Sequence, residues 1–439
     1  MSATNVLRGP VLPSLIAVGI VAASVVGTVT LTGKHSGSAS AASAPATPPP
    51  VRNAAWVVNG AHDAPELSAL TGFWIGSDIV VRGGVDGLHA MRRGDGSAAW
   101  DLPTPGGGDL CGMSAAVDDG VGIVASQGTT ETRGGAGSAD CSVVSGVDVT
   151  SGKVLWTTPM SSSFGDPDAG AADYAATGGT AIVDSDRDQA ETGVVGLDVK
   201  TGVQKWKYGG ECEHRGKGFS AAGGHVVVAE VCQGQAKIRV LDAVTGGAVA
   251  GAAVPNLGGA THPQVVSADP LVVADDGSSP KALSFGAGGP VTVTDLGGLF
   301  ATLSDKGASR AQVSVGKDVL CFGGHQASCW TAGGTPTTPH GLPNEGAEHH
   351  DVYPVLGTGA TARIVTTGVP GHTRASLCRV TGDGTVVVEA DLSQPVSDYL
   401  GKSGTAGSYY LYADAKDLYL VDPQPSGRAA VIDVRLTAG

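Results

Sequence analysis

Short runs of β-forming residues, separated by turns that contain glycine, aspartate or proline, fill the chain from residue 54 to its end. Two consecutive stretches show the order clearly. One holds ADYAATG, TAIVDSD, VVGLDV and VQKWKY, and the next holds KGFSAAG, HVVVAEV, IRVLDA and AVAGAAV. No stretch of helical period is long enough to compete with these strands. The pattern therefore predicts an all-β fold for this part of the chain.

An internal repeat organises the strands. Three segments superpose without gaps: GVDVTSGKVLW (146–156), GLDVKTGVQKW (196–206) and VLDAVTGGAVA (240–250). They share an aspartate and a glycine four residues later, and the first two add a tryptophan: Asp148, Gly152 and Trp156; Asp198, Gly202 and Trp206; Asp242 and Gly246. Residues 90–100 keep Gly96 and Trp100 but have Arg92 at the aspartate position.

The turn glycine recurs about every 47 residues, at Gly96, Gly152, Gly202, Gly246, Gly289, Gly334, Gly384 and Gly427. A period of this size predicts four short strands per unit, as in a β-propeller. We therefore expect an eight-bladed β-propeller of four-stranded antiparallel blades over residues 54–439, with seven blades as the alternative. The alternative stays open because Ala54–Gly60 has the pattern of an outer strand, although the last unit already seems to have one in AVIDVRL.

The repeat resembles that of the PQQ-type, quinoprotein-like β-propeller family. The family pattern has a small residue, Asp two positions later, Thr-Gly, often Lys, and Trp eight positions after the Asp. It is matched by Gly146, Asp148, Gly152, Lys153 and Trp156, and by Gly196, Asp198, Thr201, Gly202 and Trp206. The resemblance covers residues 54–439. It implies that the Trp packs between neighbouring blades and that Asp and Thr tie the turn, and it implies nothing about a cofactor. At fold level the chain also resembles the propellers of outer-membrane assembly factors.

The N-terminal sequence predicts that the protein is exported from the cytoplasm. Residues 1–10 are expected to be cytoplasmic, and residues 11–33 form an uncharged run of 23 residues between Arg8 and Lys34. At about 1.5 Å per residue a helix of this length spans roughly 34 Å, enough to cross a membrane once. We expect one transmembrane helix that holds the propeller on the extracytoplasmic side of the cell membrane. The alternative is a secretory signal cleaved after small residues near Ala41 or Ala44, which would give a secreted protein. Residues 34–53 predict a linker rich in Ser, Ala and Pro.

Charge and cysteine content narrow the function. Lys plus Arg total 27 against 41 for Asp plus Glu, and the net charge of −14 argues against nucleic-acid binding. Seven cysteines in an exported chain permit disulfides and leave at least one thiol free. Because the strand ends that carry them meet at one end of a blade, we expect Cys111 to pair with Cys141 and Cys212 with Cys232. We expect Cys321 to pair with Cys329 across a hairpin between second and third strands, which leaves Cys378 as a buried free thiol; a link between Cys329 and Cys378 is the alternative.

The two ends of the predicted blades differ. The turns between first and second strands and between third and fourth strands are short and rich in glycine. At the other end lie long loops, at residues 126–140, 160–170, 185–193 and 339–351. Loops on a rigid scaffold carry most recognition, so the long-loop end is the predicted binding surface.

The candidate metal-binding and cofactor-binding motifs of the sequence each lack residues that such motifs require. Asp184, Asp186 and Asp188 resemble the start of a calcium loop, but Gln189 and Val195 stand where such a loop has Gly and Glu. The pair His349 and His350 would point to opposite sides of a strand edge, which disfavours a shared metal. The chain also lacks the adjacent cysteines on which many PQQ-dependent alcohol dehydrogenases stack the quinone. We therefore expect no cofactor, no metal and no catalytic residues. The predicted function is a non-catalytic extracytoplasmic scaffold that binds an unidentified protein or cell-envelope ligand, and the alternative is a PQQ-dependent dehydrogenase with a diverged site.

Overall fold

The chain divides into two parts, Met1–Pro48 and Pro49–Gly439. A computed structural model describes residues 48–436 except for residues 60–69, 85, 129–140, 165–173, 185–192, 210–213, 234, 250–262, 269–270, 276–280, 285–291, 296–312, 317–318, 323–327, 332–335, 338, 344–350, 359–361, 368–373, 402–408 and 424–428. The predicted membrane segment, residues 11–33, lies outside the described residues. Within the described residues no helix is long and apolar enough to span a bilayer.

Consecutive strands pair antiparallel in units of up to four. The first unit is β3 (Leu70–Ile75), β4 (Ile79–Gly84), β5 (Gly87–Arg92) and β6 (Ala98–Pro103). The second is β7 (Leu110–Met113), β8 (Val121–Gln127), β9 (Cys141–Asp148) and β10 (Val154–Phe164). The third is β11 (Tyr174–Thr177), β12 (Thr180–Asp184), β13 (Val194–Asp198) and β14 (Gln204–Tyr208), and the fourth contains β15 (His214–Ala222), β16 (His225–Cys232) and β17 (Gln235–Asp242).

The later units follow the same order. A fifth group contains the paired strands β18 (Pro263–Ala268) and β19 (Leu271–Asp275), and the pair β20 (Lys281–Ser284) and β21 (Thr292–Asp295). A sixth unit is β22 (Val313–Val315), β23 (Val319–Phe322), β24 (Ser328–Thr331) and β25 (Pro336–Thr337). Next come β26 (Asp351–Thr358), β27 (Ala362–Thr367), β28 (Ala375–Val380) and β29 (Val386–Leu392), and then β30 (Tyr410–Ala413), β31 (Asp417–Val421) and β32 (Ala429–Arg435).

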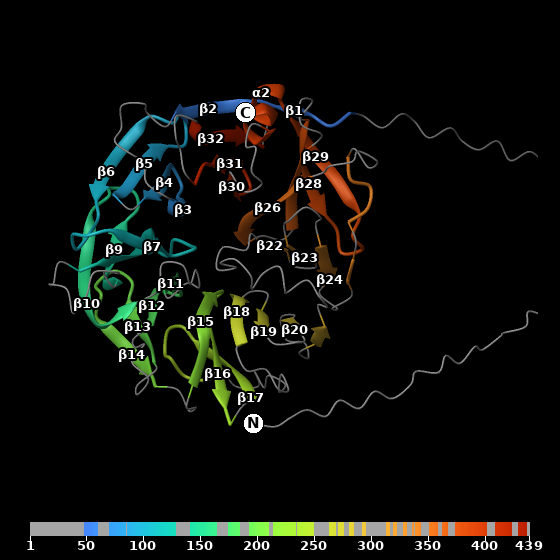
Figure 1. The fold of residues 1–439 in the computed structure, drawn as a ribbon. Coiled ribbons are helices and arrows are strands. Elements are labelled where there is room, and N and C mark those ends of the chain that lie inside the picture. Colours follow the sequence, from blue (N-terminus) through green and yellow to red (C-terminus); the bar gives the residue numbers. More distant parts are fainter. Residues whose placement is uncertain are drawn as a thin grey trace, which may run out of the picture. The chain divides into compact units, whose positions relative to one another are not determined.

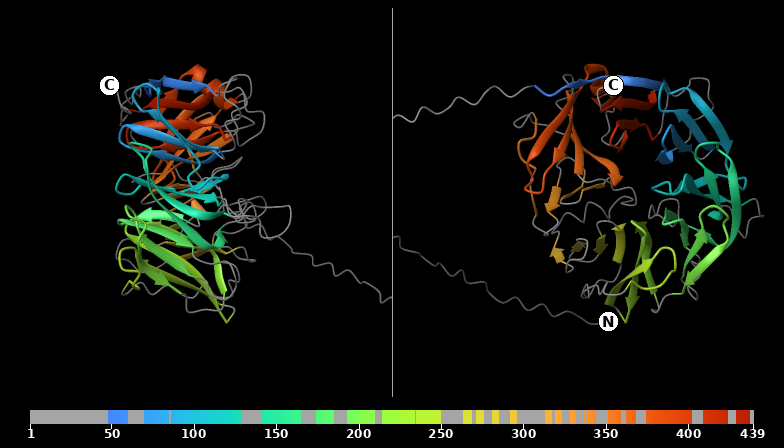
Figure 2. Two further views of the ribbon diagram at one scale, coloured as in Figure 1. Left: turned by 90° about the vertical axis from the view of Figure 1, so that its left-hand side faces the viewer. Right: turned by 180° about the vertical axis from the view of Figure 1, so that it is seen from behind.

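First strands of neighbouring units meet. β15 pairs with β18, β22 with β26, and β26 with β30, each pair being parallel. Within Pro49–Gly439, the units follow one another in chain order about a common centre (Figures 1 and 2). The described residues thus confirm an all-β fold built mainly of four-stranded antiparallel sheets, consistent with a β-propeller.

The N-terminal strand completes the C-terminal unit. β2 (Ala54–Asn59) pairs antiparallel with β32, which lies between β2 and β31. The segment AVIDVRL is therefore the third strand of this unit and β2 is its outer strand, so the two segments do not compete for the same position. We call β30, β31, β32 and β2 the closing unit, and its contact with the first unit the closing seam.

Two short elements differ from the sequence prediction. β1 (Val51–Arg52), placed in the linker by its composition, pairs in parallel with the end of β29. An eight-residue helix, α2 (Gln394–Gly401), follows β29 and buries Val396 and Leu400 in the core of the neighbouring strands. The hydrophobic core otherwise lies between the faces of adjacent sheets, where residues such as Ile123 and Val144 of the second unit pack with Ala181 and Val183 of the third.

Candidate functional site

The repeat tryptophans dock on the next unit. Each lies on a fourth strand and covers the turn glycine of the following unit, and its indole N–H donates a hydrogen bond to a backbone carbonyl three residues before that glycine. The three contacts are Trp100 on Gly152 with Val149 O at 3.2 Å, Trp156 on Gly202 with Val199 O at 2.8 Å, and Trp206 on Gly246 with Ala243 O at 2.9 Å.

Glycine is required in these turns for two reasons. The φ angles of Gly152, Gly202 and Gly246 are +70° to +71°, a backbone conformation that residues with a Cβ rarely adopt. A Cβ at these positions would also lie only 2.5 to 2.7 Å from an indole ring atom.

The repeat aspartates tie the same turns. Asp148 accepts hydrogen bonds from the N–H and hydroxyl of Ser151, at 2.7 and 2.9 Å. Asp198 and Asp242 do the same with Thr201 and Thr245. The threonine hydroxyls are the main cause that lowers the pKa of Asp198 and of Asp242. The repeated polar residues thus serve local folding, as the family resemblance implies.

A fourth tryptophan makes the same contact at the closing seam. Trp56, on β2, covers Gly96 and donates its indole N–H to the carbonyl of Arg93 at 2.9 Å. This role of Trp56 was not predicted from the sequence. A signal was present, because Ala54-Ala55-Trp56 repeats Ala98-Ala99-Trp100.

Charged side chains concentrate at the closing seam. One guanidinium nitrogen of Arg93, Nη2, donates to Asp414 at 2.7 Å and to Asp417 at 2.5 Å, and the guanidinium carbon lies 5.9 Å from the centre of the Tyr419 ring. Burial opposes the charged form, but Asp417, Tyr419 and Asp414 outweigh it and raise the pKa of Arg93. Phe73 packs beside Tyr419, with ring centres 5.5 Å apart and ring planes tilted by 50°.

Asp433 is a buried carboxyl group at this seam. It is fully buried, and neither carboxylate oxygen has a hydrogen-bond partner within the described part of the chain. Burial, followed by the charge of Asp417, raises the pKa of Asp433 to about 7. Burial, followed by the charge of Asp433, likewise raises the pKa of Tyr419, whose hydroxyl donates to Asp417 at 3.1 Å.

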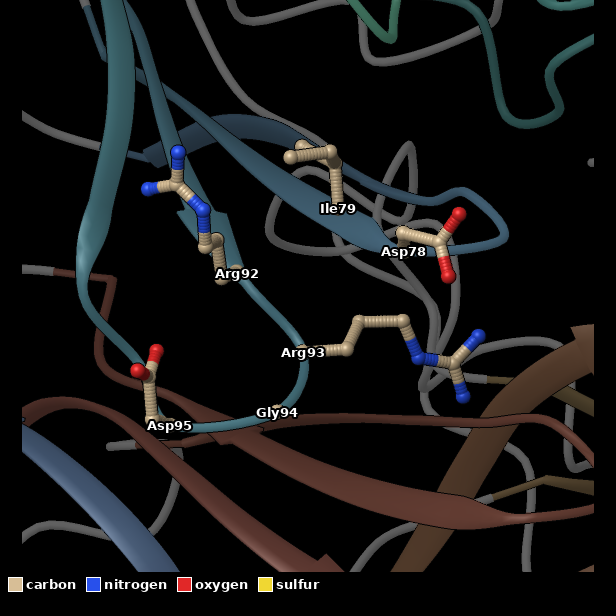
Figure 3. Close-up of a pocket in the computed structure, with 6 residues that line it drawn as sticks. All are labelled: Asp78, Ile79, Arg92, Arg93, Gly94 and Asp95. Carbon is tan, nitrogen blue, oxygen red and sulfur yellow. The ribbon is translucent and has the colours of Figure 1, made fainter.

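An open pocket of about 290 Å³ lies beside this cluster, at the turns β3–β4 and β5–β6 of the first unit. Figure 3 shows its lining residues: Asp78, Ile79, Arg92, Arg93, Gly94 and Asp95. The side chains of Arg92 and Arg93 point in different directions, and both are engaged, Arg92 with the carbonyl of Ala98 and Arg93 across the closing seam (Figure 3). This pocket lies at the short-turn end, opposite to the end where the sequence predicts binding. It brings charges of both signs together but no nucleophile with an adjacent base.

The structure contains disulfides and one buried free cysteine among the described residues. Cys111 is bonded to Cys141, and Cys321 to Cys329. Cys232 is disulfide-bonded, and its predicted partner Cys212 lies outside the described residues. Cys378 is a buried free thiol, and burial raises its pKa to about 12, so it is not a reactive thiolate.

The weak metal candidates are not brought together. Asp184 ends β12, while Asp186 and Asp188 lie outside the described residues, as do His349 and His350. In the part of the chain that the structure describes, no group of three or more His, Cys, Asp or Glu side chains is arranged to hold a metal ion. Most of the long loops, including residues 129–140, 185–192 and 344–350, also lie outside the described residues.

Fold and site together define an all-β protein, built mainly of consecutive four-stranded sheets, in which docked tryptophans join four of the neighbouring pairs of units within the described residues. No family model matches the chain, and no curated protein sequence matches it significantly. Among solved structures, BamB from Moraxella catarrhalis is 18% identical with a TM-score of 0.46, covering 84% of this chain and 97% of that one. The quinohemoprotein alcohol dehydrogenase ADHIIG from Pseudomonas putida HK5 is 11% identical with a TM-score of 0.46, covering 88% and 76%. U3-55K is 10% identical with a TM-score of 0.43, covering 86% and 97%. At such identities and scores these likenesses assign no function to the chain.

Proposed function

We propose that this chain is a non-catalytic, extracytoplasmic scaffold, an eight-bladed β-propeller that binds a protein or cell-envelope ligand. The observation that carries the proposal is the use made of the repeated residues. The repeat tryptophans join neighbouring units, and the repeat aspartates tie the turns beneath them. The residues that define the family pattern therefore build a rigid body, which leaves recognition to the loops.

The strand order of the described residues supports the proposed count of eight blades. Seven groups of strands precede the closing unit along the chain, and β2 supplies the fourth strand that β30, β31 and β32 lack. The fifth blade would consist of β18, β19, β20 and β21. The fourth would gain its outer strand near Ala248, which forms a bridge to Leu241.

Two observations support a location outside the cytoplasm. Disulfides such as Cys111–Cys141 persist in oxidising compartments and are rare in the cytosol. The uncharged run at residues 11–33 is long enough to act as a single-pass anchor. We propose that the propeller is tethered by this run on the outer side of the cell membrane.

The binding surface in this proposal is the long-loop end. The turns at the other end are short and internally tied, as at Asp198 and Thr201, and have little freedom to adapt to a ligand. The longer loops have no such repeat-encoded ties in their sequences. Within the predicted loop 339–351, His340 pairs with the short turn at Thr385 and Asp351 begins β26, so the recognition segment proposed here is residues 344–350, NEGAEHH, which carry charged and histidine residues.

The test compares three forms of the full chain in capture from an envelope extract, with bound proteins identified and quantified by mass spectrometry. One form is native, and one has residues 344–350 replaced by a short Gly-Ser turn, which leaves the His340 bridge to Thr385 and the start of β26 intact. The matched control carries Val203→Ser and Val244→Ser at short-turn residues that are 65% and 48% exposed. We expect the same specific ligand with the native chain and the control, and its loss with the loop variant. Equal capture by all three forms would contradict the assigned face.

A second assay separates scaffold from enzyme. The full chain is incubated with PQQ and calcium and then assayed for dye reduction with a panel of alcohols and sugars. A scaffold gives no turnover above buffer. Turnover that depends on PQQ would establish the alternative, a dehydrogenase with a diverged site.

A further inference from the structure

The closing seam departs from the repeat at the residue opposite the docking tryptophan. Trp100 lies across from Ala90, Trp156 from Gly146 and Trp206 from Gly196. A Cβ on Gly146 or Gly196 would lie 2.4 or 2.1 Å from the opposite indole. Gly146 and Gly196 thus make room for the indole rings of Trp156 and Trp206.

In the closing unit this position is Asp433, which lies across from Trp56. Among the residues that the structure describes, this fully buried carboxylate has no hydrogen-bond partner, and it stands where the first three units have Ala or Gly. Apolar packing gives no reason for this substitution, because burying an unpaired carboxylate is unfavourable.

Two further repeat positions change at the same seam. Arg93 occupies the place of Val149, Val199 and Ala243, which are 3%, 1% and 0% exposed in their units. Asp417 begins the second strand of its unit, opposite Arg435, where Val121 and Thr180 begin theirs opposite Asp148 and Asp198. The closing seam is thus built of charges at positions that are mainly apolar or small elsewhere.

The charges around Asp433 do not balance. From β31 it faces Asp417 and Tyr419, from the β30–β31 turn Asp414, from the first unit Arg93, and from its own strand Arg435, while β2 contributes only the uncharged Trp56. Arg93 is already shared by Asp414 and Asp417. An ionised Asp433 would therefore be a third carboxylate facing two arginines, Arg93 and Arg435, of which Arg93 is already engaged by the other two carboxylates.

We propose that the closing seam is a proton-controlled latch, in which Asp433 holds a proton while β2 is docked and releases it to solvent when β2 opens. The neutral carboxyl is the form that this geometry tolerates, because the protonated group carries no charge to desolvate and does not repel Asp417. When β2 leaves, Trp56 leaves with it and Asp433 becomes exposed to water. The ordinary pKa of the carboxyl is 3.8, and burial raises it to about 7 in the closed ring.

The direction of the pH dependence follows from these two pKa values of Asp433. Between about pH 4 and pH 7 the closed ring retains a proton that the open ring has lost, so the opening constant of β2 rises up to tenfold per pH unit. Below this window both states are protonated, and above it both are ionised, so Asp433 adds no further pH dependence. The latch is tightest in acid and loosens as the pH approaches neutrality.

Hydrogen exchange with mass spectrometry on the full native chain tests this, with rates at pH 5, 6, 7 and 8 corrected for intrinsic exchange. Peptides covering β2 should lose protection by up to about 100-fold from pH 5 to pH 7 and then level off. Peptides covering the start of β10 are the internal control, because Trp156 there lies opposite Gly146. A β2 response no larger than that of β10 would overturn the proposal.

The variant Asp433→Asn keeps the size of the side chain and removes the titration. In this variant the opening constant of β2 should become independent of pH between 5 and 7. Persistence of the full pH dependence would overturn the assignment to Asp433. Should the variant not fold, the native comparison of β2 with β10 decides by itself.

Discussion

Gly202 and Gly179 form a matched pair that isolates the space needed by a docked tryptophan. Both belong to turns of the third unit, with φ angles of +71° and +70°. A Cβ on Gly202 would lie 2.7 Å from a ring atom of Trp156, whereas one on Gly179 would meet nothing within 4 Å. Gly179→Ala therefore introduces only the left-handed backbone strain, about 1 to 2 kcal/mol, partly offset by the lower entropy of the unfolded chain.

Gly202→Ala adds overpacking to the same backbone strain. Moving the indole away costs about 1 to 3 kcal/mol, and it endangers the 2.8 Å hydrogen bond from Trp156 to the carbonyl of Val199. We expect Gly202→Ala to be less stable than Gly179→Ala by about 1 to 3 kcal/mol. Urea unfolding, followed by both far-ultraviolet circular dichroism and tryptophan fluorescence, measures the difference. Equal losses in the two variants would mean that the indole is not held against the turn.

Three more predictions concern buried groups. The raised pKa of Asp433 means that the native state binds a proton more tightly than the unfolded chain does, so the free energy of unfolding falls from about pH 4 to pH 7. In urea titrations, the free energy of unfolding of Asp433→Asn should be higher than that of the native chain by up to about 4 kcal/mol at pH 8 and equal to it at pH 4. Replacing both Cys111 and Cys141, 30 residues apart, with serine should cost about 3 to 4 kcal/mol in the chain-entropy treatment, also measurable by urea unfolding. Cys378 should resist iodoacetamide at pH 8 in the native chain and react after denaturation, as mass spectrometry would show; rapid native labelling would contradict its burial.

The strand order was predictable because its signals are local. Alternating strands, turn glycines such as Gly152 and Gly202, and the Asp–Thr ties all lie within about a dozen residues of one another, and they recur along the chain. The helix α2 also had a local signal, with Pro395 in its first turn and Val396 and Leu400 four residues apart on its buried side. It was missed because two turns of helix are too short to stand out from a strand pattern.

The closing seam was not predictable from local patterns. Arg93 meets Asp414 and Asp417 across separations of 321 and 324 residues. In the sequence, Arg93 is simply a charged residue in a turn, and Asp433 is an aspartate within a hydrophobic strand. Their roles become visible only when β2 is paired with β32, because that register places Asp433 opposite Trp56.

The unusual chemistry of this seam has a physical rationale in specificity. Several units present an outer tryptophan, and several present a turn glycine, so apolar docking alone distinguishes poorly between correct and incorrect neighbours. Buried ion pairs add little net stability, but breaking one by removing its partner is costly. If the closing unit docked on the turn of Val149 instead of Arg93, Asp414 and Asp417 would lose their shared cation, and Asp417 would be buried without it. The charges therefore penalise closure in the wrong register at the junction where β2, early in Pro49–Gly439, meets the C-terminal strands of the same unit.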